Sequence, residues 1–248
     1  MYGPERKSSL VIELGPSFFA GESEAAMESL SSVLGAVLIA FLCGGLGQAA
    51  WGMVIGPVED AFVVNTSADE SFGSEERICT WTAYMSGGRG RSYIRFSLSG
   101  MPEESVVSGV TLNLYQYDAG GFVPIVNIHH VADDTWTQSS LTWNNQPLPA
   151  PGATDQIVTK DIGYEAEWVS FDLLSSGVWD YGADLNDGYV SLLIKSTEVG
   201  DERHNFYSSE ETIEVNYRPY LEITVVPEPT ALVLLGLGSL GLWRRRSA

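Results

Sequence analysis

Residues 110–115 read Val-Thr-Leu-Asn-Leu-Tyr, and this alternation decides the fold class. Apolar side chains at every second position turn one face of an extended strand toward a core and the other toward solvent. Similar runs occur on both sides, separated by clusters of Gly, Pro, Asn and Asp. They cover residues 61–65, 91–98, 125–131, 168–173, 189–196 and 220–226. We therefore expect an all-β protein, an antiparallel β-sandwich of jelly-roll type, with one short helix at 173–181.

The body of the chain, residues 51–226, is strongly acidic. It holds eight basic and 26 acidic residues, a net charge of −18, within a chain whose formal net charge is −19. Because this excess repels phosphates, nucleic acid is excluded as a partner. The same carboxylates keep an exported protein soluble and make Ca²⁺ the one cofactor worth considering.

The N-terminal end has the pattern of a targeting segment. Residues 33–42 (VLGAVLIAFL) form an apolar run as long as a signal-peptide core and too short for a membrane span, and Gly47-Gln48-Ala49 then offers small residues for cleavage. We expect a signal peptide at 27–49, after a translated upstream extension at 1–26. The alternative is a buried helix of an N-terminal extension. Cleavage would leave Cys79 as a lone cysteine, most simply a small buried apolar side chain.

The C-terminal end, residues 227–248, combines three features in order. Pro227-Glu228-Pro229 is followed by an almost wholly apolar stretch at 231–243 and then by Arg244, Arg245 and Arg246. The 13 residues of this stretch would rise about 20 Å as a helix, less than the about 30 Å of a bilayer core. This order resembles the PEP-CTERM sorting signal of Gram-negative bacteria. A plain tail anchor is the alternative.

The resemblance to that signal implies a route for the protein. The chain would cross the inner membrane through the secretion machinery, with cleavage by signal peptidase. The C-terminal segment would anchor it in the membrane transiently. An exosortase-type protease would then process it and release it to the cell surface or the medium.

The body carries a second resemblance, in five stretches that follow one another. They are DAFV at 60–63, ESFGS at 70–74, RSYIRFSL at 91–98, DDTWTQSSLTWNNQP at 133–147 and FYSSE at 206–210. Together they resemble the DNRLRE domain, which is grouped with carbohydrate-binding module family 96. The resemblance spans nearly all of residues 60–225 and implies an extracellular β-sandwich domain at 51–226. It also implies a polysaccharide partner, in some members an acidic one such as alginate.

One strand and the residues just before it hold the candidate sugar contacts. They are Trp81, Tyr84, Arg89, Arg91, Tyr93 and Arg95. Arg91 and Arg95 share a strand face, from which two guanidinium groups could hold the carboxylates of an acidic sugar. Trp81 and Tyr84 could stack on sugar rings. The alternative is that the arginines pair with carboxylates of adjacent strands.

Two further sets of residues have a structural and a functional interpretation. Asp60, Asp133 and Asp134 could ligate Ca²⁺, although solvated turns and side-chain caps use the same residues more often. Trp136 and Trp143 could stack on sugars, but tryptophans among turn residues more often close the end of a sandwich.

No catalytic motif stands out in the sequence. His129 and His130 are adjacent in a strand and point to opposite faces, so they cannot both ligate one metal ion. We therefore expect a secreted, non-catalytic protein that associates with extracellular polysaccharide, most simply an acidic one. The alternatives are a polysaccharide lyase or hydrolase and a matrix protein without specific sugar binding.

Overall fold

The alternating stretch at 110–115 lies inside β5 (Ser105–Gly121), a strand of 17 residues. The computed structural model describes residues 50–82, 87–101, 105–122, 124–148, 155–197 and 201–227. The other strands of these residues are β1 (Trp51–Ile55), β2 (Pro57–Val64), β3 (Arg77–Thr82), β4 (Arg89–Ser97), β6 (Ile125–Val131), β7 (Gln156–Asp161), β8 (Glu167–Asp172), β9 (Tyr189–Ser196), β10 (Glu202–Tyr207) and β11 (Tyr220–Pro227). The all-β prediction is confirmed.

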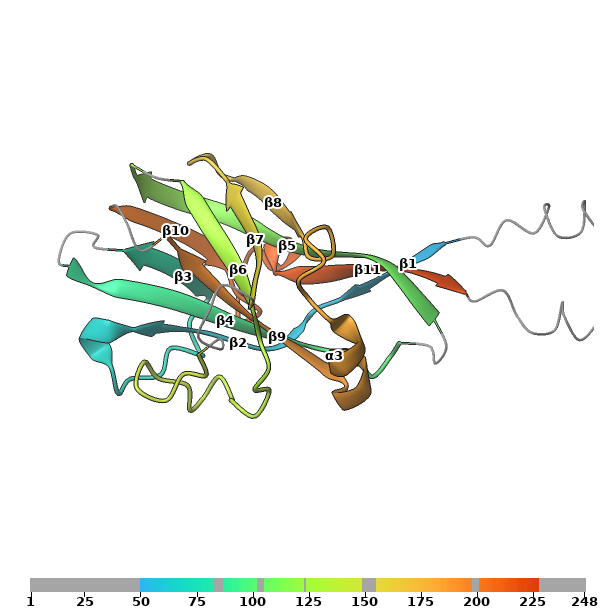
Figure 1. The fold of residues 1–248 in the computed structure, drawn as a ribbon. Helices are drawn as coiled ribbons and strands as arrows, with labels where there is room; N and C mark the ends of the chain where they lie inside the picture. Colours follow the sequence, from blue (N-terminus) through green and yellow to red (C-terminus); the bar gives the residue numbers. More distant parts are fainter. Residues whose placement is uncertain are drawn as a thin grey trace, which may run out of the picture. The chain divides into compact units, whose positions relative to one another are not determined.

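The strands form one curled antiparallel sheet whose two halves face each other. The order is β1-β11-β5-β10-β3-β4-β9-β6-β7, with β2 paired to β4 and β8 paired to β5 (Figure 1). β3 and β4 join the two halves through only two residue pairs, Trp81 with Gly90 and Thr82 with Arg89. The sheet therefore turns a corner at this point.

The core lies between the two halves. Leu112 and Leu114 of β5 and Phe206 of β10 pack with Ile94 of β4 and Leu192 of β9, and all five are fully buried. The inward residues of β5 are those that the period-two pattern predicts. Burial of this apolar surface is the main source of stability, because Cys79 is the one cysteine of the described residues and is not in a disulfide.

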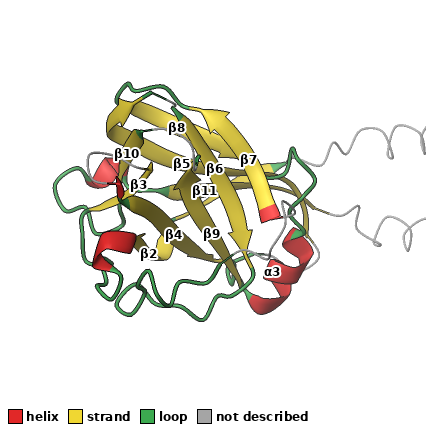
Figure 2. Cartoon of the chain, turned by 60° about the vertical axis from the view of Figure 1, so that its left-hand side comes forward, coloured by secondary structure: helices red, strands yellow, loops and turns green. Residues whose placement is uncertain are grey.

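The helix lies later in the chain than the sequence predicts. Residues 173–180 contain turns but no helix, and α3 spans Tyr181–Asp187. Two short 3₁₀ turns lie elsewhere in the chain, at Asn65–Ser67 and Val215–Tyr217. Asp172 accepts hydrogen bonds from the backbone N–H groups of Leu174 and Ser175, and the turn that begins there ends at Gly177, whose φ is 65°. Asp180 instead caps α3, and Gly188 ends it with φ of 84°. The helices lie at the margins of the strand layers (Figure 2).

The two ends of the described body lie side by side. β1 pairs with β11, and Trp51 stands opposite Val225 (Figure 1). The predicted extension and signal peptide, and the sorting segment from Glu228 to Arg246, lie outside the described residues. Within the described residues, no helix combines the length and apolar character that crossing a membrane requires.

Candidate functional site

The segment after β6, residues 132–148, covers the face of β4 that the sequence predicts for sugar binding. Tyr93, at the middle of that face, is fully buried. Its hydroxyl donates to the Pro147 backbone oxygen at 2.9 Å and lies 3.0 Å from Gln146 Oε1. Burial raises the pKa of Tyr93 above its usual value. The tyrosine therefore anchors the segment to the sandwich.

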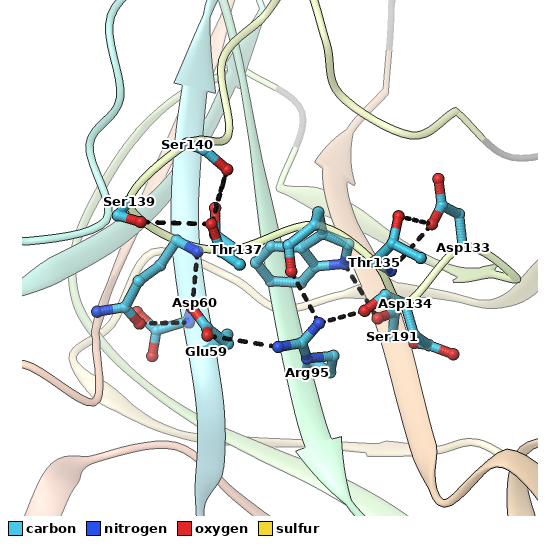
Figure 3. A network of polar contacts seen from close by, with 12 residues as sticks. Glu59, Asp60, Arg95, Asp133, Asp134, Thr135, Thr137, Ser139, Ser140 and Ser191 are labelled. Atoms are coloured by element: carbon cyan, nitrogen blue, oxygen red, sulfur yellow. Dashed lines mark hydrogen bonds and ion pairs between the residues drawn. The ribbon is translucent and has the colours of Figure 1, made fainter.

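Arg95 fixes the beginning of the same segment. Its Nη1 donates to the backbone oxygens of Asp134 and Trp136, the latter at 2.7 Å. Its Nη2 lies 3.4 Å from Glu59 Oε1, with 12% of the arginine side chain and 21% of the glutamate side chain exposed. Figure 3 shows the guanidinium between the carboxylate and the backbone. Of the two interpretations that the sequence allows for Arg95, the structure agrees with pairing to a carboxylate of an adjacent strand, because Glu59 belongs to β2.

The two tryptophans of the segment close the outer side of β4 and β9. Trp136 is 6% exposed, packs against Tyr93, and donates from its indole N–H to Ser191 Oγ at 3.0 Å. Trp143 is half-buried on the same cluster, with the Arg91 guanidinium 4.8 Å from its ring centroid. Trp136 therefore packs inside the sandwich, as the structural interpretation of the sequence predicts.

The three candidate metal ligands have separate local roles. Asp60 is buried and accepts the Ser209 backbone N–H at 2.7 Å; burial raises its pKa to about 6. Asp133 is exposed and accepts from the Thr135 N–H and hydroxyl, which lowers its pKa. Burial raises the pKa of Asp134. In the described part of the chain, no three His, Cys, Asp or Glu side chains gather where they could hold a metal ion.

Three of the predicted sugar contacts do come together, around Trp81. A narrow crevice of about 10 Å³, too small to enclose a sugar, is lined by Trp81, Arg89 and Arg91, and Lys195 joins them because it pairs with Arg91 across β4 and β9. Tyr84 lies outside the described residues. Arg95 and Tyr93 are engaged under the 132–148 segment instead. The sugar contacts themselves stay a prediction. The candidates that remain together are those that line the crevice at Trp81.

Trp81 also lines a second hollow, on the outer side of β3 and β10. This hollow has a volume of about 190 Å³ and is lined by Arg77, Cys79, Trp81, Arg203 and Asn205. Arg203 stands opposite Trp81 in the β3–β10 pairing and is ion-paired with Asp118 at 2.8 Å. We use the name Trp81 site for the indole and the five cations of the two hollows, Arg77, Arg89, Arg91, Lys195 and Arg203.

The indole of Trp81 is held against backbone. A Cβ atom added at Gly90 would come within 2.2 Å of the Trp81 ring, so only glycine leaves room for it. The ring also packs near Phe62, with centroids 6.2 Å apart. Because the aromatic ring is fixed in this way, it offers a preorganised surface at the meeting point of the two hollows.

The sequence reasoning missed a second group of aromatic residues on the same half of the sheet. They belong to β5, β8, β10, β11 and the 3₁₀ turn before β11: Tyr115, Tyr117, Trp168, Tyr207, Tyr217 and Tyr220. We call them the tyrosine row. Trp168 is 37% exposed and the tyrosines are half-buried. The signal was the alternation of Tyr115 and Tyr117 with inward Leu114 and Gln116, which marks an outward aromatic face.

A hollow of about 510 Å³ adjoins this row. It is lined by Ser74, Glu75, Glu76, Arg77, Tyr117, Tyr207 and Glu211. Arg77 therefore borders both this hollow and the Trp81 site. Aromatic faces and carboxylate acceptors are groups that can stack on a sugar ring and accept its hydroxyl hydrogen bonds.

Comparisons with known proteins match two parts of the chain to family models. The model of carbohydrate-binding module family 96 matches residues 53–225, and the PEP-CTERM protein-sorting motif matches residues 225–246. A curated protein from a Bacillus species, described as gellan lyase, is 25% identical over 197 residues. That match covers 76% of this chain and 7% of the lyase, so the chain spans a small part of the relative's length.

Proposed function

This chain belongs to carbohydrate-binding module family 96, and we propose that it is a secreted, non-catalytic protein that binds acidic polysaccharide at the Trp81 site. The sorting motif at residues 225–246 marks it for export and for processing by an exosortase. The polysaccharide would then be met at the cell surface or in the medium.

One observation carries the proposal: the distribution of positive charge. Five of the eight basic residues of the body line the two hollows that share Trp81. The carboxylates beside these cations include Asp118, paired with Arg203, and Asp155, whose charge acts on His129 together with those of Lys195 and Arg91. Three glutamates, Glu75, Glu76 and Glu211, line a hollow with Arg77. On a body with eight basic and 26 acidic residues, this is a local enrichment in cations. Guanidinium groups beside an aromatic ring suit a carboxylated sugar.

Affinity electrophoresis tests the proposal directly. The full-length chain is run through gels that contain alginate, xanthan or a neutral glucan, with and without Ca²⁺. We expect retardation by at least one acidic polysaccharide. A Lys195→Ala, Arg203→Ala double variant should lose about tenfold or more in affinity, since one charge-assisted hydrogen bond is worth about 1.5–3 kcal/mol. Unchanged retardation of a folded double variant would refute the site.

Lys160 provides the matched control. It is an exposed cation of β7 whose ammonium group donates to the Ser170 backbone oxygen, and it lines neither hollow. Lys160→Ala removes one positive charge from the same body, as the Lys195→Ala single variant does. Its affinity should therefore stay at the level of the unsubstituted chain.

A polysaccharide lyase or hydrolase is the second candidate function, favoured by the similarity to a protein described as gellan lyase. Incubation of the purified chain with the same polysaccharides separates the two. Release of unsaturated products or reducing ends would establish an enzyme. Absence of retardation by every polysaccharide would favour a matrix protein without specific sugar binding.

A further inference from the structure

The outer face of β3, β10 and β5 changes character along its length. Arg203 and Trp81 stand opposite each other at one end, and Arg77 and Tyr207 stand opposite each other at the other. Four residues separate the two levels on each strand, so the Cα atoms of Trp81 and Arg77 are about 13 Å apart at 3.3–3.4 Å per residue. This distance is comparable to a few sugar units.

The charge also changes along this face. The hollow at the Trp81 end is lined by two arginines and no carboxylate, whereas the hollow at the Tyr207 end is lined by three glutamates and the single cation Arg77. Glu75 and Glu76 are exposed, and Glu211 is buried with its carboxylate capping the backbone N–H groups of Ile213 and Glu214. A sugar carboxylate in the second hollow would meet like charges, which cost several kcal/mol when placed side by side.

The tyrosine row continues this second region across the strands. Tyr207 lies 6.0 Å from Tyr115, and Tyr115 stands opposite Trp168 with ring centroids 5.5 Å apart. Neighbouring strands are about 4.8 Å apart, so the row from Arg77 on β3 to Trp168 on β8 extends about 14 Å. Stacked rings without cations suit an uncharged sugar. The glutamate carboxylates can accept hydrogen bonds from the hydroxyls of such a sugar.

We propose that the ligand is a heteropolysaccharide, in which a carboxylated sugar lies at the Trp81 site and uncharged sugars of the same chain lie on the glutamate hollow and the tyrosine row. This inference rests on the proposed function and makes it more specific. Arg77 borders both hollows and marks the boundary between the charged and the uncharged sugar. A polymer made only of uronate would place carboxylates beside Glu75 and Glu76 and bind less tightly.

Two oligosaccharides of equal length test the inference by titration calorimetry on the full-length chain. Hyaluronan oligosaccharides alternate a uronate with an uncharged amino sugar, and oligogalacturonate carries a carboxylate on every unit. We expect about tenfold or greater preference for the alternating chain, equivalent to about 1.4 kcal/mol. Equal affinity, or preference for oligogalacturonate, would overturn the inference while leaving acidic polysaccharide binding in place. Absence of binding to any acidic glycan would instead refute the proposed function.

Two variants test whether the glutamate hollow and the tyrosine row cause the preference for the alternating oligosaccharide. Glu75→Gln, Glu76→Gln removes two exposed charges and should raise the affinity for oligogalacturonate, so that the preference narrows to about threefold or less. Tyr207→Leu keeps an apolar side chain and should weaken binding of the alternating chain more than binding of oligogalacturonate. An unchanged preference in the folded glutamate double variant would overturn the inference, whatever the tyrosine variant does.

Discussion

Arg95 and Arg89 lie on the same strand but should behave in opposite ways when each is replaced by methionine. Arg95 has its guanidinium inside the molecule, bonded to two backbone oxygens and beside Glu59. Arg89 is exposed and lines the crevice at Trp81. Methionine keeps most of the length of the side chain and removes the charge. The pair therefore separates a structural arginine from one at the proposed sugar site.

The loss of stability in Arg95→Met can be estimated from the groups that lose their hydrogen-bonding partner. Removing one partner of a buried ion pair costs about 3–5 kcal/mol, and the partial exposure of Glu59 lowers this to about 2–4 kcal/mol. At about 2–4 °C per kcal/mol for a domain of this size, the melting temperature should fall by about 5–15 °C. Arg89→Met should change stability by less than about 0.5 kcal/mol.

Thermal unfolding followed by circular dichroism, and glycan affinity measured on the same samples, decide between the two roles. Arg95→Met should lower the melting temperature and keep its affinity at temperatures where it is folded. Arg89→Met should keep its melting temperature and bind less tightly. The reasoning is refuted if Arg95→Met melts within about 2 °C of the unsubstituted chain and loses glycan binding.

Three other measurements follow from the described residues. Burial lowers the pKa values of His129 and His204 to about 4, so the unfolded state takes up more protons between pH 6.5 and 4. Stability should fall by up to about 3 kcal/mol per histidine as the pH drops through this window. Asp60, with its pKa raised to about 6, partly offsets this effect, as do the raised pKa values of His130, Asp134 and Glu202. Denaturant unfolding at pH 7 and pH 4.5 checks this, and a stability that is constant or rises on acidification would contradict it. Gly90→Ala should displace the Trp81 indole and weaken glycan binding, seen as a changed tryptophan fluorescence with lower affinity; an unchanged spectrum would argue against the packing. Cys79, whose pKa burial raises to about 12, should react with a thiol reagent only after unfolding, and rapid labelling of the folded chain would contradict its burial.

The strands that the sequence predicts well are those whose two faces differ in polarity. β6 and β9 have the predicted bounds, and β5 contains the predicted alternation. β10 reads Glu-Arg-His-Asn-Phe-Tyr, and the inward residues include Glu202 and His204, both fully buried. Because polar residues occupy both faces, the period-two signal is lost. β3 was missed for the same reason, since polar Thr80 and Thr82 are buried in it, and β1 and β7 were missed as well.

The buried polar residues of β10 are kept inside by specific partners. Glu202 accepts from Thr197 Oγ1 at 2.8 Å, and Nδ1 of His204 lies 2.7 Å from Gln116 Oε1. These partners come from residues 5 and 88 positions away in the chain. A pattern of polarity along one strand cannot show that such partners exist. The same limit applies to Arg95, whose carboxylate partner lies on β2.

The site was predictable only as far as neighbours in sequence are neighbours in space. Trp81, Arg89 and Arg91 are close in the chain and do line one crevice. Strand pairing brings Lys195, opposite Arg91, to this crevice and Arg203, opposite Trp81, to the second hollow. The sequence shows the composition of each strand, but the register between distant strands decides which cations meet.

The overall acidity of the body and the proposed acidic ligand are compatible because they act over different distances. The net charge of −18 produces a repulsive field that salt screens within about 8 Å at physiological ionic strength. The cations of the Trp81 site act through contacts much shorter than this distance. Binding therefore depends on the clustering of the basic residues. Eight cations spread evenly over the surface would give no local enrichment. The strand registers that bring five of them to the two hollows sharing Trp81 are what make an acidic protein a reasonable partner for an acidic sugar.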